Sequence, residues 1–378
     1  MALSLRPNLV YSFLEKLYWM FRQDRLLHLL LLVGVILYLI HPVKEHEAAR
    51  SIDWRTIYSL AGLMLLTKGI ERSGYLSHLG MHVIHRLHHE RPLAIFLVLF
   101  AALGSMLLTN DIMLFIVVPL TLGLRKISIL PVGRLVIFEA LAVNTGSLFT
   151  PIGNPQNIFL WQQSHLSFLD FTLQMAPLEM VLLPVLLGVT ALAFRNVPIT
   201  VELDECPEPA EMKMLYRCLL LYAGFVLGIE SGYPGWSLML LLVFFTILFP
   251  KILIDVDWSL IAVFILMFLD IGFLTHFDML SSWLASVHLH SSVHMFLFSL
   301  FTSQVISNVP AALLLQKFLP SGRLLAYAVN VGGFGFVLGS LANLIALRMA
   351  RERMLWLEFH FYSVPFLVMG AGLAWLLL

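Results

Sequence analysis

The chain has 378 residues, 60% of them hydrophobic and only 12% charged, and its mean hydropathy is +0.89. Soluble domains carry about 25% charged residues, so this composition excludes an ordinary soluble protein and predicts an all-α integral membrane protein. Basic and acidic residues balance at 23 each, which gives no indication of nucleic-acid binding, and two cysteines, Cys206 and Cys218, are too few for a disulfide framework.

The first apolar segment, residues 26–41, follows a basic N-terminal region. No small-residue cleavage site comes after it, so we expect an uncleaved first span rather than a signal peptide. Residues 8–22 are ambiguous: they could form an extra span, but their charged side chains favour a helix in the membrane interface. Residues 1–52 are therefore predicted to contain an interfacial helix and the first span.

Two later regions contain apolar segments shorter than the roughly 20 residues that a perpendicular helix needs to cross the hydrocarbon core. They are 92–124 and 293–319, and a polar tip divides each of them, at 109–111 and at 307–310. We interpret each region as a re-entrant hairpin whose tip reaches the middle of the membrane. The alternative is two ordinary spans joined by a tight surface turn. Other apolar segments are 54–70, 133–149, 171–194, 214–229, 235–249, 258–275, 323–338 and 359–378.

The apolar pattern is interrupted most strongly at residues 144–157, called here the first polar stretch. Its two prolines and two glycines, together with hydroxyl and amide side chains, predict that no helix runs through it unbroken. Freed backbone groups cost several kcal/mol each in hydrocarbon unless protein or water satisfies them, so such a break usually lines a cavity. The alternative is a loop at the membrane surface.

A second polar stretch, residues 330–343, matches the first at an offset of 186. Interrupted apolar segments at corresponding places in two halves of a chain are a sequence signature of a transporter's binding site. The matched pairs are Asn144 with Asn330, Gly146 with Gly332, Gly153 with Gly339, and Asn157 with Asn343.

Further matched landmarks occur in the same order at offsets of 188 to 204. We therefore predict two repeats, 53–195 with a broken helix at 133–165 and 257–378 with a broken helix at 323–347. Residues 196–256 between them are predicted to hold scaffold spans and an acidic cytoplasmic linker. The landmarks are Asp53-Trp54 with Asp257-Trp258, Thr109-Asn110 with Ser307-Asn308, Leu169-Asp170-Phe171 with Leu357-Glu358-Phe359, and Pro177 with Pro365.

The distribution of basic residues favours inverted repeats, with about 10–11 spans and a cytoplasmic N-terminus. If residues 71–91 are cytoplasmic, 17 Lys and Arg residues fall on the cytoplasmic side and 5 on the outer side, with Lys68 inside a span. This bias follows the positive-inside rule. The cytoplasmic group is Arg6, Lys16, Arg22, Arg25, Arg72, Arg86, Arg91, Arg125, Lys126, Arg134, Arg195, Lys213, Arg217, Lys251, Arg348, Arg351 and Arg353.

Two hairpin tips and two broken helices would bring four polar elements together. Helix N-termini there present unpaired N–H groups that suit an anion, and unwound carbonyls suit Na⁺. We therefore predict a site for a small anion substrate and a coupling ion, Na⁺ or H⁺. Candidate substrate ligands are Thr109, Asn110, Asn154, Asn157, Ser307, Asn308, Ser340 and Asn343, and candidate cation or proton ligands are Asp111, Asn110, Gly153, Asn308 and Gly339.

Four motifs resemble those of the ion transporter superfamily, which includes divalent-anion/sodium symporters, citrate–metal transporters, ArsB-type arsenite pumps and NhaD-type sodium/proton antiporters. They are Thr109-Asn110-Asp111, Asn154-Pro155-Gln156-Asn157, Ser307-Asn308-Val309-Pro310 and Gly339-Ser340-Leu341-Ala342-Asn343. The resemblance covers about residues 50–378 and is strongest to the YbiR type of bacterial inner-membrane protein.

This resemblance implies a scaffold and a transport domain, a homodimer, elevator-like motion and a substrate between the tips in the inner membrane. It implies Na⁺ sites at Asn110 with Gly153 and at Asn308 with Gly339. The dicarboxylate symporters carry Ser-Asn-Thr at both tips, whereas the third positions here are Asp111 and Val309. An Asp at the first tip is more similar to the arsenite and sodium/proton branches.

Several other polar residues have structural alternatives. A carboxylate at membrane depth makes Asp111 a candidate cation ligand or proton carrier, or else a helix cap. Glu139 and Asp270 are interpreted as structural acids that pair with a residue such as Lys68. A stripe of histidines could bind Zn²⁺ but is expected to be the polar face of a surface helix. The stripe is His78, His82, His85 and His89, while His288, His290 and His294 form none.

The sequence thus predicts a secondary transporter for an anion of the di- or tricarboxylate or inorganic oxyanion class, with no cofactor, no catalytic residue and no resident metal. No phosphate-binding fingerprint indicates ATP as the energy source. The alternatives are a Na⁺/H⁺ antiporter or an arsenite-type efflux permease that uses Asp111. An intramembrane hydrolase with Ser147 or Ser307 as nucleophile is disfavoured because no histidine lies near either residue in the sequence.

Overall fold

The computed structural model describes residues 7–124, 130–199, 210–277, 282, 291–319, 322–352 and 354–378. Within these ranges the regular structure is helical apart from one isolated bridge between His89 and Pro198, so the all-α prediction is confirmed. Some residues interpreted from the sequence lie outside the described ranges: Arg6, Arg125, Lys126, residues 202–209 of the acidic linker, Cys206, His288, His290 and Arg353.

The chain forms two compact units, and each takes residues from both halves of the sequence. Unit 1 comprises Met1–Arg72 and Cys218–Val287. Its helices are α1 (Pro7–Gln23), α2 (Arg25–Ile40), α3 (Glu45–Ser51), α4 (Trp54–Arg72), the part of α11 (Met212–Glu230) from Cys218 onward, α12 (Pro234–Leu248), α13 (Pro250–Asp255) and α14 (Trp258–Leu274).

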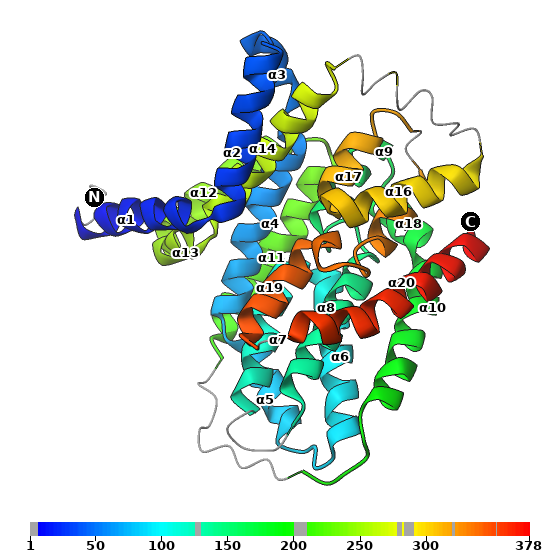
Figure 1. The fold of residues 1–378 in the computed structure, drawn as a ribbon. Helices are drawn as coiled ribbons and strands as arrows, with labels where there is room; N and C mark the ends of the chain where they lie inside the picture. The colour runs from blue at the N-terminus through cyan, green and yellow to red at the C-terminus, as the bar shows by residue number, and fades with distance from the viewer. Residues whose placement is uncertain are drawn as a thin grey trace. The chain divides into compact units, whose positions relative to one another are not determined.

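Helices at corresponding places pack in corresponding ways within unit 1. Helix α14 packs along α2 and α3, while α4 packs along α12 and α13 (Figure 1). Asp53 and Asp257 cap α4 and α14, because each carboxylate accepts hydrogen bonds from backbone N–H groups two and three residues later. The Asp-Trp landmarks of the sequence therefore mark two equivalent helix starts.

Unit 2 comprises Ser73–Arg217 and His288–Leu378. Its first helices are α5 (Tyr75–Ile84), α6 (Glu90–Leu107), α7 (Asn110–Leu124), α8 (Val132–Ser147), α9 (Pro155–Ser164) and α10 (Phe168–Ala193). The later ones are α16 (Ser292–Ile306), α17 (Asn308–Leu315), α18 (Arg323–Val331), the single 3₁₀ turn η1 (Val337–Gly339), α19 (Leu341–Ala350) and α20 (Leu355–Leu377).

Both polar stretches interrupt helices, as predicted. Helix α8 ends at Ser147 and α9 begins at Pro155, while α18 ends at Val331 and α19 begins at Leu341. The two regions predicted as re-entrant hairpins form the packed helix pairs α6–α7 and α16–α17, and their re-entrant position in the membrane stays a prediction. All four elements belong to unit 2, in which α6 is drawn in cyan, α9 and α10 in green, α16 in yellow, α18 in orange and α20 in red (Figure 1).

The predicted histidine stripe does not lie on one helix. Helix α5 ends at Ile84, His85 is its C-cap, and His89 is the N-cap of α6. Only His78 and His82 therefore share helical spacing. Among the described residues there is no group of three His, Cys, Asp or Glu side chains that could hold a metal ion.

Four described helices are long and apolar enough to cross a membrane, namely α6, α10, α11 and α20. The bent pair α1–α2, whose axes differ by 70°, would be a fifth. Shorter apolar helices are α7, α12, α14, α16 and α19. The chain is therefore a multi-pass membrane protein, while the number of spans and their orientation stay predictions.

An ion cluster joins three helices of unit 1. Asp255, the last residue of α13, accepts a hydrogen bond from Lys16 of α1 at 2.7 Å and pairs with Arg72 of α4. Burial alone would raise the pKa of Asp255, but hydrogen bonds and charge from Lys16 and Arg72 hold this pKa below its ordinary value. The cluster therefore stabilises the unit most when the carboxyl is ionised.

We expect Asp255→Asn to lower the midpoint of thermal unfolding at pH 7 by about 1–3 °C, because partly exposed ion pairs contribute about 0.2–1 kcal/mol each. The contribution is present above the ordinary aspartate pKa and is lost as the pH falls through the lowered pKa of the folded state. Thermal unfolding of the purified protein in detergent, with exposed Glu45→Gln as a control, checks this. A difference that is the same at pH 7 and pH 3.5 would contradict it.

Candidate functional site

Two asparagines at the start of α9, Asn154 and Asn157, hydrogen-bond to backbone groups of the break between α8 and α9. Asn157 Nδ2 donates to the carbonyls of Leu148 and Thr150, both at 3.0 Å, and more weakly to that of Ser147. Asn154 caps α9 by accepting the N–H of Asn157 at 2.8 Å. These bonds satisfy carbonyls and an N–H that the interruption leaves without helical partners, which is what lets the break exist in a buried place.

The second break is closed in the same way. Asn343 Nδ2 donates to the carbonyl of Gly333 at 2.8 Å and is 3.5 Å from that of Phe336. Gly333 and Phe336 stand 186 residues after Ser147 and Thr150, so the two breaks use equivalent acceptors. The last turn of each break also corresponds, since Gly153 and Gly339 donate to the carbonyls of Thr150 and Phe336.

The two breaks are bonded to each other through asparagines. Asn144 Nδ2 donates to Asn343 Oδ1 at 2.8 Å, and Asn330 Nδ2 donates to Asn157 Oδ1 at 2.7 Å. Adding 186 to Asn144 and subtracting it from Asn343 turns the first bond into the second. Each helix interruption is therefore completed by the other copy, and the two polar stretches lie side by side within unit 2.

This cross-linked asparagine network extends by one more layer in each copy. Asn144 and Asn330 also donate to the carbonyls of Ala140 and Ala326, four residues earlier. Asn144 Oδ1 accepts a hydrogen bond from Ser340 Oγ at 3.0 Å, and Asn330 Oδ1 accepts one from Asn154 Nδ2 at 3.0 Å. The asparagine network is defined here as Asn144, Asn154, Asn157, Asn330, Ser340 and Asn343, all of them buried.

The first hairpin tip is bonded to the first break. The N–H of Asn110 donates to the carbonyl of Gly153 at 2.9 Å, and the N–H of Asp111 donates to Asn110 Oδ1 at 3.0 Å. Thr109, Asn110 and Asp111 are all buried. Their arrangement places the first turn of α7, with its partial positive charge, against the first polar stretch.

The second tip carries a strained residue. Ser307 has φ +74°, a region that a residue with a Cβ rarely adopts, and its hydroxyl donates to Asn308 Oδ1 at 3.4 Å. The Asn308 amide lies beside Gly333, where a Cβ would stand 3.3 Å from Asn308 Nδ2. Strain of this kind persists only where surrounding structure enforces it and is concentrated at functional sites.

Two glycines allow the hairpins to approach the broken helices. A Cβ at Gly146 would collide with the Ala102 carbonyl and stand 2.6 Å from Ser105 Oγ, and a Cβ at Gly332 would stand 2.5 Å from Ser303 Cβ. Ser105 and Ser303 are separated by 198 residues, the same offset as the two tips. The first arm of each hairpin therefore packs on the helix that enters its break.

All predicted site residues lie in unit 2, and all are buried except half-buried Ser307. The structure joins Asn110 to Gly153 through the backbone and joins Asn154, Asn157, Ser340 and Asn343 in the asparagine network. Gly339 lies against the carbonyl of Gly332, and Asn308 lies beside Gly333. The tip and glycine residues adjoin the asparagine network in the sequence at Gly153 and Gly339. Their roles differ, because the side chains of the network asparagines already bond to protein.

Sequence reasoning did not assign Asn144, Asn330 and Gln304 to the site. Asn330 makes four bonds at the centre of the network, and its signal was its match to Asn144 at the start of each stretch. Gln304 of α16 donates to the carbonyl of Gly332 and accepts the N–H of Phe336 at 2.6 Å. Its first-repeat counterpart is Met106, whose carbonyl accepts the Thr150 hydroxyl at 2.6 Å.

Glu139, Glu179 and Asp270 are buried acids that lie outside the asparagine network. Thr121 donates to Glu139, while Glu179 and Asp270 have no hydrogen-bond partner within the described residues. The interpretation that Lys68 pairs with Glu139 or Asp270 is wrong, because Lys68 pairs with Glu71, three residues along α4, at 2.8 Å. A partner within one helical turn satisfies the lysine without a second helix.

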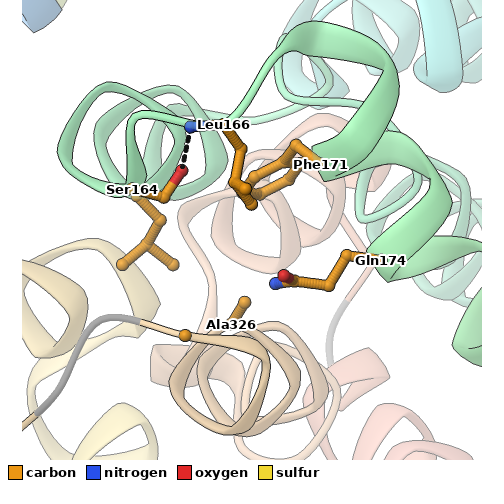
Figure 2. Close-up of a pocket in the computed structure, with 7 residues that line it drawn as sticks. Ser164, Leu166, Phe171, Gln174 and Ala326 are labelled. Atoms are coloured by element: carbon orange, nitrogen blue, oxygen red, sulfur yellow. Dashed lines mark hydrogen bonds between the residues drawn. The ribbon is translucent and has the colours of Figure 1, made fainter.

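A pocket of about 170 Å³ lies between the end of α9, the start of α10 and the start of α18. In Figure 2 the Gln174 side chain points toward Ala326 across it, and Ser164 accepts the N–H of Leu166. The Asn330 amide donates to the carbonyl of Ala326, one turn along α18, but no predicted site residue lines the pocket. It is therefore separate from the candidate site.

Broken helices that share a buried polar network, flanked by hairpin tips, in a multi-pass helical membrane protein define a membrane transporter. The citrate transporter family model matches residues 17–321, and the chain belongs to that family. This family lies within the ion transporter superfamily that the motifs resemble.

Individual relatives agree with this membership. The chain is 46% identical to the inner membrane protein YbiR of Escherichia coli over 94% of its own length and 95% of that protein. It is 30% identical to an uncharacterized transporter of Methanocaldococcus jannaschii over 84% of its own length and 87% of that protein. A shorter similarity, 31% identity over 39% of the chain and 30% of the other protein, is to the silicon efflux transporter of Oryza sativa subsp. japonica.

We expect Asn330→Ala to lower the unfolding midpoint in detergent by at least about 5 °C. The change leaves Asn157 Oδ1 without its donor and Gln156 Nε2 without its acceptor, and each buried group left unsatisfied costs about 1–3 kcal/mol. Asn144→Ala removes the equivalent bonds and should have a similar effect, whereas exposed Gln163→Ala on α9 should change the midpoint little. A loss below 1 °C for both asparagine variants would show that the network does not hold the breaks together.

Proposed function

We propose that the protein is a secondary active transporter that moves a small anion, of the di- or tricarboxylate or inorganic oxyanion class, coupled to Na⁺ or H⁺. The observation that carries this proposal is the asparagine network, which joins two helix interruptions and thereby gathers four helix N-termini, those of α7, α9, α17 and α19. Such termini favour an anion, and interrupted backbone favours a cation.

The network narrows the choice of residues that contact the ligand. Asn157 and Asn343 have both amide atoms bonded to protein, so these side chains position the breaks instead of binding the substrate. In our proposal the hairpin tips bind the substrate. Substrate ligands are then Thr109, Asn110, Ser307 and Asn308, and the proposed cation sites pair the tip asparagines with the backbone of Gly153 and Gly339.

Relatives support this range of substrates. The family description names citrate, and one relative is named for silicon efflux. The shared chemistry is a small oxygen-rich solute. A Na⁺/H⁺ antiporter or an arsenite-type efflux permease is the second candidate, and buried Asp111 at the first tip favours it, because an intramembrane carboxylate is typical of cation and proton paths.

The transport movement is proposed to be elevator-like. Hairpins and broken helices belong to unit 2, while α1–α4 and α12–α14 belong to unit 1, so unit 2 is the proposed mobile domain and unit 1 the scaffold. Inverted repeats, a homodimer and a cytoplasmic N-terminus complete the proposal. An inner-membrane location is supported by the name of the Escherichia coli relative.

A ligand screen tests the proposal directly. Purified protein in detergent is titrated with citrate, arsenite and silicate, each in Na⁺ and in choline buffer, and thermal unfolding is followed because a ligand of the folded state raises the midpoint. A solute that stabilises the protein is then tested for accumulation in proteoliposomes under a Na⁺ gradient or a pH gradient. Stabilisation without gradient-driven flux would contradict transport.

Asn110→Ala and Asn308→Ala are expected to lower flux at least about a hundredfold while the protein stays folded. Each change removes an amide from a tip but leaves the asparagine network intact, so the unfolding midpoint should fall much less than in Asn330→Ala. Uptake into proteoliposomes and thermal unfolding are measured on the same preparations. Unchanged flux in both variants would defeat the assignment of the tips.

Asp111→Asn is expected to change the dependence of flux on Na⁺ or on pH. The amide has the shape of the carboxyl but carries neither its charge nor its titrating proton, whereas its oxygen can still accept a backbone N–H as a helix cap does. Flux is compared with the unaltered protein between pH 5.5 and 8.5 with and without Na⁺. Identical profiles would leave Asp111 as a helix cap only.

A further inference from the structure

One buried acceptor next to the asparagine network is left over, and the orientation of the network determines which atom it is. Asn157 Nδ2 faces two carbonyls at 3.0 Å, so that atom must be the nitrogen, and Asn157 Oδ1 must face Asn330. Asn330 then presents Nδ2 to Asn157 and Oδ1 to the donors on its other side. Neither the Asn157 amide nor the Asn330 amide can be turned over without placing two acceptors or two donors in contact.

Gln156, at the second position of α9, is bonded to the free side of Asn330. Its Nε2 donates to Asn330 Oδ1 at 3.3 Å, alongside Asn154 Nδ2 at 3.0 Å. The amide nitrogen is thereby fixed, and Gln156 Oε1 becomes the remaining atom. That oxygen is buried and has no hydrogen-bond partner within the described residues, in a side chain only 2% exposed.

The second copy has no such atom. Adding 186 to Gln156 gives Ala342, so the acceptor exists beside the first break alone. In the second copy the equivalent acceptor is Asn144 Oδ1, which accepts a hydrogen bond from Ser340 Oγ. Buried side-chain acceptors usually receive a donor, and the Gln156 amide oxygen, at the N-terminus of α9, is therefore open to one from outside the described residues.

We propose that Gln156 Oε1 is a direct ligand of the species carried by the site, either the coupling cation or a hydroxyl group of a protonated oxyacid. Both present positive charge to a neutral carbonyl-type oxygen. This inference rests on the proposed function and deepens it, because it makes the site asymmetric: the first copy supplies an oxygen that the second copy does not.

The test uses the full-length protein in detergent at constant ionic strength. The probes are NaCl against choline chloride, arsenite near neutral pH, where it is protonated, and citrate as a solute that is ionised. The variants are Gln156→Met, which keeps the length but removes both amide atoms, and Gln156→Glu, which keeps an oxygen and adds charge. Gln163→Met, the same change at an exposed position of the same helix, is the matched control.

Gln156→Met is expected to weaken the apparent affinity of NaCl or of arsenite about tenfold or more, as the loss of one ligand oxygen predicts, while Gln163→Met leaves it unchanged. A loss confined to NaCl identifies the cation as the partner, and a loss confined to arsenite identifies the hydroxyl. Gln156→Glu should retain or strengthen NaCl binding and weaken citrate binding, because a carboxylate attracts the cation and repels the anion.

Two results would overturn the inference, and they are distinguishable. If a probe stabilises the unaltered protein and both Gln156 variants bind it with unchanged affinity, Gln156 is not a ligand and the proposed function survives. If no probe stabilises the unaltered protein, the proposed binding function itself fails for these solutes and the inference fails with it. Gln156→Glu keeps the test decisive should Gln156→Met unfold, since it preserves the size of the side chain and one oxygen, although it removes the Nε2 bond to Asn330 Oδ1.

Discussion

The structure of unit 2 depends on one constraint: polar backbone groups at two helix breaks must be satisfied in a place from which water is excluded. An unpaired buried carbonyl or N–H costs about 1–3 kcal/mol, and each break frees several. Asn157 and Asn343 each donate to carbonyls of their own break and accept from the other copy. Neither break is complete alone, and this makes the pair of interruptions a single structural element.

In this arrangement the asparagines that hold the two breaks together are different residues from those at the tips, to which we assign ligand binding. Amide side chains have only two polar atoms, so an asparagine that bonds to carbonyls on one side and to another asparagine on the other has both of these atoms engaged with protein. The tips are different, because the bond from the Asn110 N–H to the Gly153 carbonyl anchors the first tip through its backbone and leaves the side-chain nitrogen to other partners. A rigid support beside adaptable groups is a general requirement of binding sites.

Much of this could be predicted from the sequence because glycines, prolines and amide side chains that cluster within a few residues interrupt a helix, whereas a single proline does not, as α10 runs through Pro177 and Pro184. The breaks at residues 144–157 and 330–343, the hairpin regions and the helical class all follow from such local signals. Partners of individual side chains could not be predicted. Lys68 pairs with Glu71 instead of a buried acid, and His89 lies beyond the end of α5, because several partners and boundaries were compatible with the same spacing.

Comparison of the two copies separates the residues that build the site from those that give it specificity. Positions with the same bonds in both copies, such as Asn144 and Asn330, answer the structural constraint that the copies share. Positions that differ are not required by the frame in both copies, and they include Asp111 against Val309 and Gln156 against Ala342. Both differences add an oxygen to the first copy, on the first turns of α7 and α9. A symmetric frame with an acid and an amide on one side favours a ligand whose two ends differ in charge, which is what an anion accompanied by a cation or a proton would present.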